Sequence, residues 1–152
     1  MLKAWGINMA KNKPWEDMDK LGKLVNSYTS TRIENASKEQ MIRFSKMPHE
    51  VIDELIKEGY ADPEDRQNWA PSLQELNTFM RTWTSLEGHE GAEITGHGYI
   101  IMPPRDDARV TLEGIAGKGL SVLAMEDAIA ELRHADDFEF SIKDGVFYSW
   151  WD

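Results

Sequence analysis

The stretch AEITGHGYIIMPPRDDARVTLEGIA, residues 92–116, decides the fold of this chain. Two segments with the alternation of β-strands, 92–102 and 108–116, flank the turn 103–107, where a pair of prolines lies outside any hydrogen-bonded ladder. Alternation of apolar and polar side chains is typical of a strand with one buried face. The stretch therefore predicts an antiparallel β-hairpin.

Pairing of Met102 with Ala108 sets the expected register of this hairpin. The neighbours across the two strands are then Ile100 and Val110, Tyr99 and Thr111, Gly98 and Leu112, and His97 and Glu113. One face of the hairpin is polar, with Thr95, His97, Tyr99, Arg109, Thr111 and Glu113. Antiparallel sheets commonly turn such a face to solvent.

A second hairpin is predicted near the C terminus, in FEFSIKDGVFYSWW, residues 138–151. A two-residue Asp-Gly turn would pair Ile142 with Phe147, whereas a three-residue loop with Gly145 in a bulge position would pair Ile142 with Val146. We prefer the three-residue loop, because it gathers six apolar side chains on one face. Phe147 and Trp151 then lie on the other face.

Helical periodicity dominates the rest of the chain. Between the hairpins we expect a short strand at 120–123 and a helix over 125–135. The other expected elements are an edge strand over 2–7 and helices over 16–28, 37–46, 48–59, 62–69 and 71–83. Capping boxes at Ser37 and Ser72 mark two of these helix starts.

These elements predict an α+β fold in which a helical N-terminal half packs on an antiparallel sheet. The sheet is built mainly from the two C-terminal hairpins, which flank one helix. A chain of 152 residues can bury a substantial core as one domain. We therefore expect a single domain over 1–152, mainly helical over 1–86 and β-rich over 87–152.

Charge is distributed unevenly along the chain. Residues 87–152 carry 5 Lys and Arg against 14 Asp and Glu, whereas residues 1–86 carry 12 against 13. Direct binding to nucleic acid requires basic patches and is not expected. An acidic surface can serve solubility alone, or it can engage a basic protein.

Composition also limits the compartment and the chemistry. The chain has no cysteine, which excludes disulfides and thiolate chemistry. Its N-terminal residues are too polar for a signal peptide, and no apolar run approaches the roughly 20 residues of a membrane span. We expect a soluble cytoplasmic protein that does not enter membranes.

Two weak sites for chemistry involve His97. With His89 and Glu93 it could supply metal ligands, but the spacing matches no established motif, so we expect no metal and no cofactor. With Glu113 and Tyr99 it could form an acid–base site, and an ion pair with Glu113 would raise the pKa of the imidazole. An ordinary solvated sheet face is the preferred interpretation, and a non-catalytic protein is preferred to an enzyme.

Aromatic side chains among acids favour a binding function. The chain has 6 Trp, and adjacent Trp150 and Trp151 cannot face the same side of a strand. We expect Tyr99, Arg109, Phe147 and Trp151 to form the binding surface. The leading hypothesis is a small protein that engages a basic protein partner through an acidic, aromatic sheet face, as an immunity or antitoxin-like inhibitor does.

Three alternatives stay open. One is a metal-assisted or acid–base enzyme centred on His97. Another is a small-molecule-binding protein with a pocket near Gly96 and Gly98, although these glycines also make room for a bulky side chain packed across the sheet. An exposed Trp could equally form the contact of a homodimer.

Overall fold

The computed structural model describes residues 13–152, which form four α-helices and one five-stranded antiparallel sheet. The helices are α2 (Met18–Val25), α3 (His49–Lys57), α4 (Leu73–Ser85) and α5 (Val122–Leu132). The strands are β1 (Met41–Met47), β2 (Glu93–Ile101), β3 (Arg109–Lys118), β4 (Asp137–Ser141) and β5 (Val146–Trp150). The α+β prediction is confirmed, and the expected strand over 2–7 lies outside the described residues.

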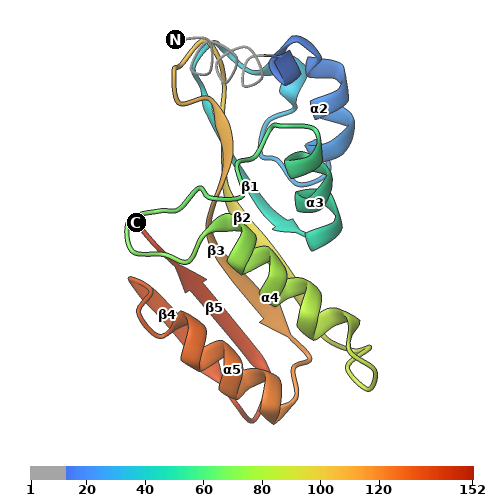
Figure 1. The fold of residues 1–152 in the computed structure, drawn as a ribbon, viewed down its shortest axis with the longest axis vertical. Helices are drawn as coiled ribbons and strands as arrows, with labels where there is room; N and C mark the ends of the chain where they lie inside the picture. The colour runs from blue at the N-terminus through green and yellow to red at the C-terminus, as the bar shows by residue number, and fades with distance from the viewer. Residues whose placement is uncertain (1–12) are drawn as a thin grey trace.

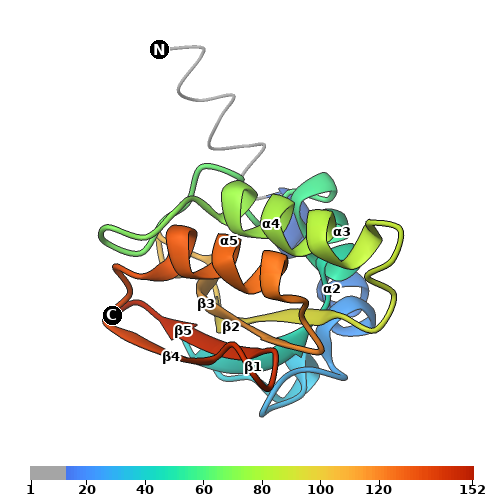
Figure 2. The same ribbon diagram turned by 90° about the horizontal axis from the view of Figure 1, so that it is seen from below.

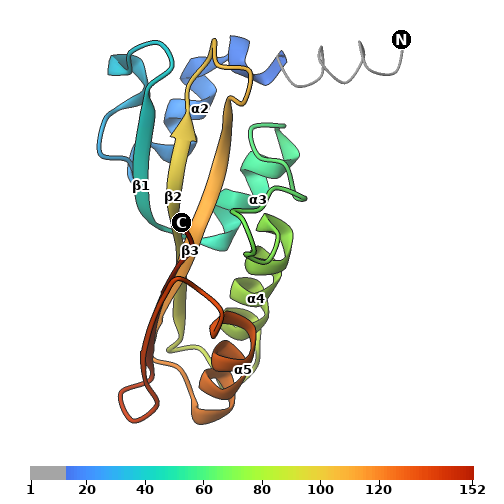
Figure 3. The same ribbon diagram turned by 90° about the vertical axis from the view of Figure 1, so that its left-hand side faces the viewer.

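The sheet has the order β1-β2-β3-β5-β4, so the central hairpin lies between β1 and the C-terminal hairpin. Helices α3, α4 and α5 lie along one face of the sheet (Figure 1). No helix of the described part of the chain covers the opposite face, as the view from below (Figure 2) and the side view (Figure 3) show. We call this uncovered side the open face.

The central hairpin has the predicted register near its turn. Tyr99 pairs with Thr111 and Gly98 with Leu112, as expected. The register then shifts by one residue, so that His97 pairs with Gly114 and Glu113 is the extra residue of a bulge. The predicted pair of His97 and Glu113 is therefore wrong, because a bulge leaves its extra residue without a cross-strand partner.

Two predicted helices in the middle of the chain are confirmed. Helix α3 ends before Gly59, whose φ of +86° belongs to the left-handed region. Helix α4 begins after Ser72, whose side chain accepts a hydrogen bond from the backbone N–H of Glu75. A glycine after the last turn of α3 and a serine N-cap before α4 thus mark the ends of these helices as the sequence predicts.

The segment after Ser37 forms strand β1 and not the predicted helix. The Gln40 side chain does accept a hydrogen bond from the Ser37 N–H, but the two residues close a turn in which Glu39 has a φ of +63°. Ile42 and Phe44 alternate into the core, and β1 pairs with β2. Pairing with a neighbouring strand therefore outweighs the local helix signal.

Two further predictions are corrected. Residues 62–69 form turns in place of a helix, because the Asp62 carboxylate accepts the Glu64 N–H in a local turn and the following residues pack against β3. No strand forms at 120–123, because the Ser121 hydroxyl accepts the Ala124 N–H and caps α5. Helix α2 occupies only the middle of the predicted range 16–28.

The C-terminal hairpin exists, but both predicted registers are wrong. Ser141 pairs with Val146 and Phe140 with Phe147, which leaves a four-residue connection. The Ser141 hydroxyl donates to the Asp144 carboxylate within this turn. Since a slip of one residue reverses the faces, the side chain of Phe147 turns toward the helices and that of Tyr148 lies on the open face.

Candidate functional site

The centre of the open face is built around His97 of β2. Its ring stacks on Tyr148 of β5, with ring centroids 4.9 Å apart and planes 5° apart. Its Nε2–H donates a hydrogen bond of 2.8 Å to the backbone carbonyl of Ser149. The imidazole therefore joins the central hairpin to the C-terminal hairpin.

Burial sets the protonation state of His97. Desolvation lowers the pKa of the imidazole, and the positive charge of Arg43 acts in the same direction, although the hydrogen bond to Ser149 opposes them. This direction is opposite to the expected effect of an ion pair with Glu113. At neutral pH the ring is uncharged and holds its hydrogen bond as a donor.

Arg43 and Tyr99 form a second contact, between β1 and β2. The guanidinium lies 5.1 Å from the centroid of the Tyr99 ring, and its Nη2 donates a hydrogen bond of 2.6 Å to the Tyr99 hydroxyl. A cation–π contact and a hydrogen bond therefore join Tyr99 to Arg43 of the neighbouring strand. Sequence reasoning missed Arg43, because it placed this residue on a helix.

A shallow concavity of about 260 Å³ opens between these contacts, and Arg43, His97, Glu113 and Tyr148 contribute to its lining. Burial raises the pKa of Glu113, against the opposing effects of a hydrogen bond with Trp150 and the charge of Arg43. Tyr99 does not line the concavity. Of the expected acid–base site, His97 and Glu113 therefore line the same concavity, whereas Tyr99 lies outside its lining.

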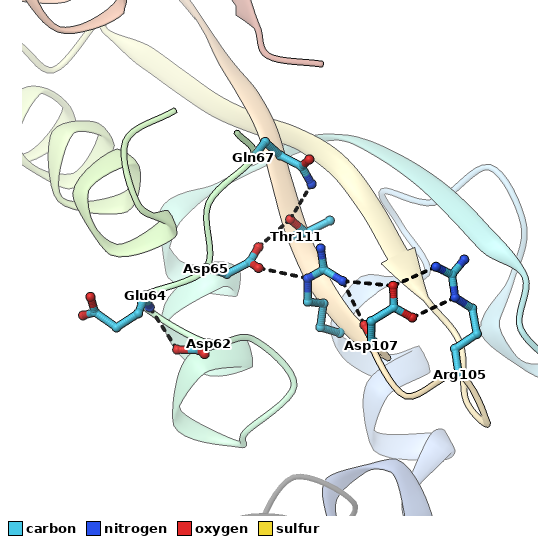
Figure 4. A network of polar contacts seen from close by, with 8 residues as sticks. Asp62, Glu64, Asp65, Gln67, Arg105, Asp107 and Thr111 are labelled. Atoms are coloured by element: carbon cyan, nitrogen blue, oxygen red, sulfur yellow. Dashed lines mark hydrogen bonds and ion pairs between the residues drawn. The ribbon is translucent and has the colours of Figure 1, made fainter. Parts of the chain in front are cut away.

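Arg109 and Thr111 belong to a polar network and not to an open binding surface. Asp65 accepts a hydrogen bond of 2.9 Å from Arg109 Nε. It also accepts one of 2.5 Å from the Thr111 hydroxyl, which Figure 4 shows. Gln67 donates a further bond of 3.0 Å to Thr111. Through these hydrogen bonds the network holds the connection between α3 and α4, residues 58–72, against β3. No local pattern in the sequence indicates it, because its members are 44 and 46 residues apart.

Trp69 lies on this fastened connection and is 93% exposed. The side chain of the preceding Asn68 donates to the backbone carbonyl of Asp152, and the Asp152 N–H donates to the Asp136 carboxylate. The connection therefore passes beside the C terminus, as Figure 1 shows. An exposed tryptophan thus lies on a connection that is bound to the C-terminal residue.

Phe147 and Trp151, two of the four expected binding residues, are 4% and 2% exposed. The Phe147 ring contacts Phe79 of α4 edge to face, with centroids 6.2 Å apart. The register of the C-terminal hairpin explains their burial, since it turns both side chains to the helices. A partner that docks on the surface cannot reach them.

The residues considered as metal ligands have separate partners. His89 contacts the Trp83 ring and the Ser121 hydroxyl, and Glu93 forms an ion pair of 2.9 Å with Lys118. His97 is bound to Ser149. Within residues 13–152 there is no group of three or more His, Cys, Asp or Glu side chains that could hold a metal ion.

Neighbouring residues fill the space beside Gly96 and Gly98 of β2. A Cβ on Gly96 would lie 2.7 Å from Leu112 and 3.3 Å from Ile52, and one on Gly98 would lie 2.0 Å from the Thr111 carbonyl oxygen. The space beside Gly96 is thus filled by side chains of β3 and α3, and the space beside Gly98 by the backbone of β3. Gly98 also borders the shallow concavity on the open face.

In comparisons with known proteins, no family model, no curated protein and no solved structure matches the chain. None of the helices in the described range is long and apolar enough to cross a membrane.

Proposed function

We propose that this protein is a small non-catalytic binding protein whose acidic C-terminal half engages a basic protein, in the manner of an immunity or antitoxin-like inhibitor. One observation carries the proposal. On the open face, Tyr148 pairs with Glu139 and Trp150 pairs with Asp137 across β4 and β5. Aromatic and carboxylate side chains therefore alternate on a surface that no helix of the described residues covers.

The carboxylates of this surface lack cationic partners within the chain. Asp137 and Glu139 are exposed, and neither forms an ion pair within residues 13–152. Exposed carboxylates attract a partner of opposite charge over long range and favour its correct orientation. Buried aromatic anchors commonly supply most of the affinity of such an interface.

Trp69 extends the same corner of the molecule. Its connection is bound to Asp152, which is bound to Asp136, and Asp136 immediately precedes β4. We define the acidic corner as Trp69, Asp136, Asp137, Glu139, Tyr148, Trp150 and Asp152. A basic partner that covers the acidic corner would also remove the apolar surface of the Trp69 indole from water, which favours binding.

The proposal is tested with two matched double variants. Asp137→Asn with Glu139→Gln removes two charges from the acidic corner, whereas Asp19→Asn with Glu54→Gln removes two exposed charges from α2 and α3. Proteins retained by the immobilised chain at low salt are identified, and the affinity of each is measured with both variants. We expect the first variant to weaken binding about tenfold and the control to leave it unchanged.

Two outcomes would contradict this function. The first is that no basic protein is retained at low salt. The second is that neutralising Asp137 and Glu139 weakens binding no more than the control does. Either result would indicate that the acidic surface serves solubility and does not bind a basic protein.

A further inference from the structure

We infer that the outer edge of β4 is the docking site, and that the partner adds an extended segment there, with basic side chains on one face and apolar side chains on the other. This inference rests on the proposed function and specifies its mode of binding. Within residues 13–152, β4 is the last strand of the sheet and pairs only with β5. In Figure 1 it lies at the border of the molecule, beyond β5.

The opposite edge of the sheet, formed by β1, is bonded to another segment of the chain. Beside β1, the Ser30 N–H donates to the Arg43 carbonyl, and the Ser45 N–H donates to the Tyr28 carbonyl. Thr29 forms an isolated bridge to Phe44. The chain thus covers one edge with its own backbone, whereas it leaves the edge of β4 available, and an open edge is a template for another strand.

The two faces of β4 differ in chemistry. Asp137 and Glu139 lie on the open face, where Lys or Arg on an added strand would stand directly beside them. Phe138 and Phe140 lie on the other face with ring centroids 5.2 Å apart, and Phe140 is 49% exposed. An added strand would cover the free side of this aromatic pair.

The beginning of α5, near the hairpin turn, also carries exposed apolar side chains. The Leu120 N–H donates to the carbonyl of Gly145, which brings the start of α5 to the hairpin turn. Val122 and Leu123 at this start are both more than half exposed. Apolar side chains on the inner face of the partner segment would find further contacts there.

Charge selects this occupant over a second copy of the chain. A symmetric antiparallel pair of β4 strands centred on Glu139 would place two Glu139 side chains opposite each other, and like charges in that position are destabilising. Charges on an edge strand also protect it from self-association. A role in preventing self-association explains the charges of Asp137 and Glu139, but it does not explain why Phe140 on the same strand is exposed.

The first experiment uses the seven-residue peptide KVKVKVK, with blocked ends, as the probe. Nuclear magnetic resonance of the full chain follows peptide binding and the hydrogen exchange of the β4 amides. Two control peptides carry N-methyl groups on all Val or on all Lys residues, which removes the donors of one strand edge at a time without changing the charge. We expect slower exchange on alternate β4 amides, and at least about tenfold weaker binding by only one of the methylated peptides.

A pair of protein variants supplies the second experiment. Glu139→Lys reverses a charge on β4, and Glu126→Lys reverses an exposed charge on α5. Only the first should weaken binding of the unmodified peptide. Folding of both variants is verified by their amide spectra, so that a loss of binding reports on the edge strand.

Failure of this inference is distinct from failure of the proposed function. If both methylated peptides bind as tightly as the unmodified one, or if both lose equal affinity, strand addition is overturned. The acidic corner can still be supported at the same time by the charge-dependent retention of a basic protein. Absence of peptide binding, or a stable dimer through β4, would also overturn strand addition.

Discussion

At the scale of single residues, Gly114 determines how closely the two hairpins approach on the open face. A Cβ at this position would lie 1.9 Å from the carbonyl oxygen of Ser149 and 2.7 Å from Nε2 of His97. Any side chain would therefore push apart the hydrogen bond between His97 and Ser149. The glycine is required by a close approach of two backbones, and not by a turn.

Gly114→Ala should therefore lower the free energy of unfolding by about 1–3 kcal/mol, the usual cost of forcing atoms into a packed site. Gly91→Ala is the matched control, because a Cβ on Gly91 would have no neighbour within 4 Å. Its effect should stay within about 0.5 kcal/mol. Urea unfolding measures both variants, and equal midpoints would show that β3 and β5 do not approach so closely.

At the scale of elements, two similar capping signals lead to different structures. Ser72 begins α4, and its buried hydroxyl accepts the Glu75 N–H at 3.1 Å. Ser37 precedes a turn and then β1. Its backbone N–H donates to the Gln40 side chain and its carbonyl accepts the Gln40 N–H, so both of these bonds are made by its backbone and neither by its hydroxyl. The segment after each serine decides the outcome, since the alternating side chains of β1 are buried by pairing with β2.

We predict that Ser72→Ala lowers the free energy of unfolding by about 1 kcal/mol, the typical value of an N-cap. Ser37→Ala should change it by less than about 0.5 kcal/mol, because Ser37 precedes a strand and its side chain caps no helix. Thermal and urea unfolding of the two variants provide the comparison. A similar loss in both would indicate that a helix begins after Ser37 in solution.

At the scale of the whole molecule, the tryptophans of residues 13–152 differ widely in burial. Trp15, Trp83 and Trp151 are buried in the core, whereas Trp69 is almost fully exposed. The Trp83 indole also donates a hydrogen bond of 2.7 Å to Asp127, which joins α4 to α5. Neighbouring Trp150 and Trp151 separate because alternate residues of a strand face opposite sides.

Trp151→Ala should therefore cost about 3–5 kcal/mol of stability, as expected for a large side chain removed from a core. Trp69→Ala should leave stability within about 0.5 kcal/mol of the parent chain. The same substitution should weaken binding of the basic partner, because Trp69 belongs to the acidic corner. Unfolding curves and affinities of the two variants separate the core role from the surface role, and a large stability loss in Trp69→Ala would contradict the exposed position.

Local signals in the sequence were sufficient for the α+β fold, for α3 and α4, and for most of the central register, because caps, turns and alternation act between near neighbours. Alternation also placed His97 and Tyr99 on one face. The four-residue connection 142–145 was harder to predict, because several turns fit the same residues. A different turn reverses the faces of a whole strand, so Phe147 and Trp151 were misplaced together.

Only the tertiary structure decided the remaining features. The bulge at Glu113, the bond between His97 and Ser149, and the network around Asp65 join residues that are distant in the chain, and no local pattern records such contacts. Residues 41–47 form strand β1 because their backbone pairs with β2 and their alternate side chains are buried in the core. The sequence by itself thus determined which segments alternate and where the acids lie, while long-range packing decided which faces and edges stay open to a partner.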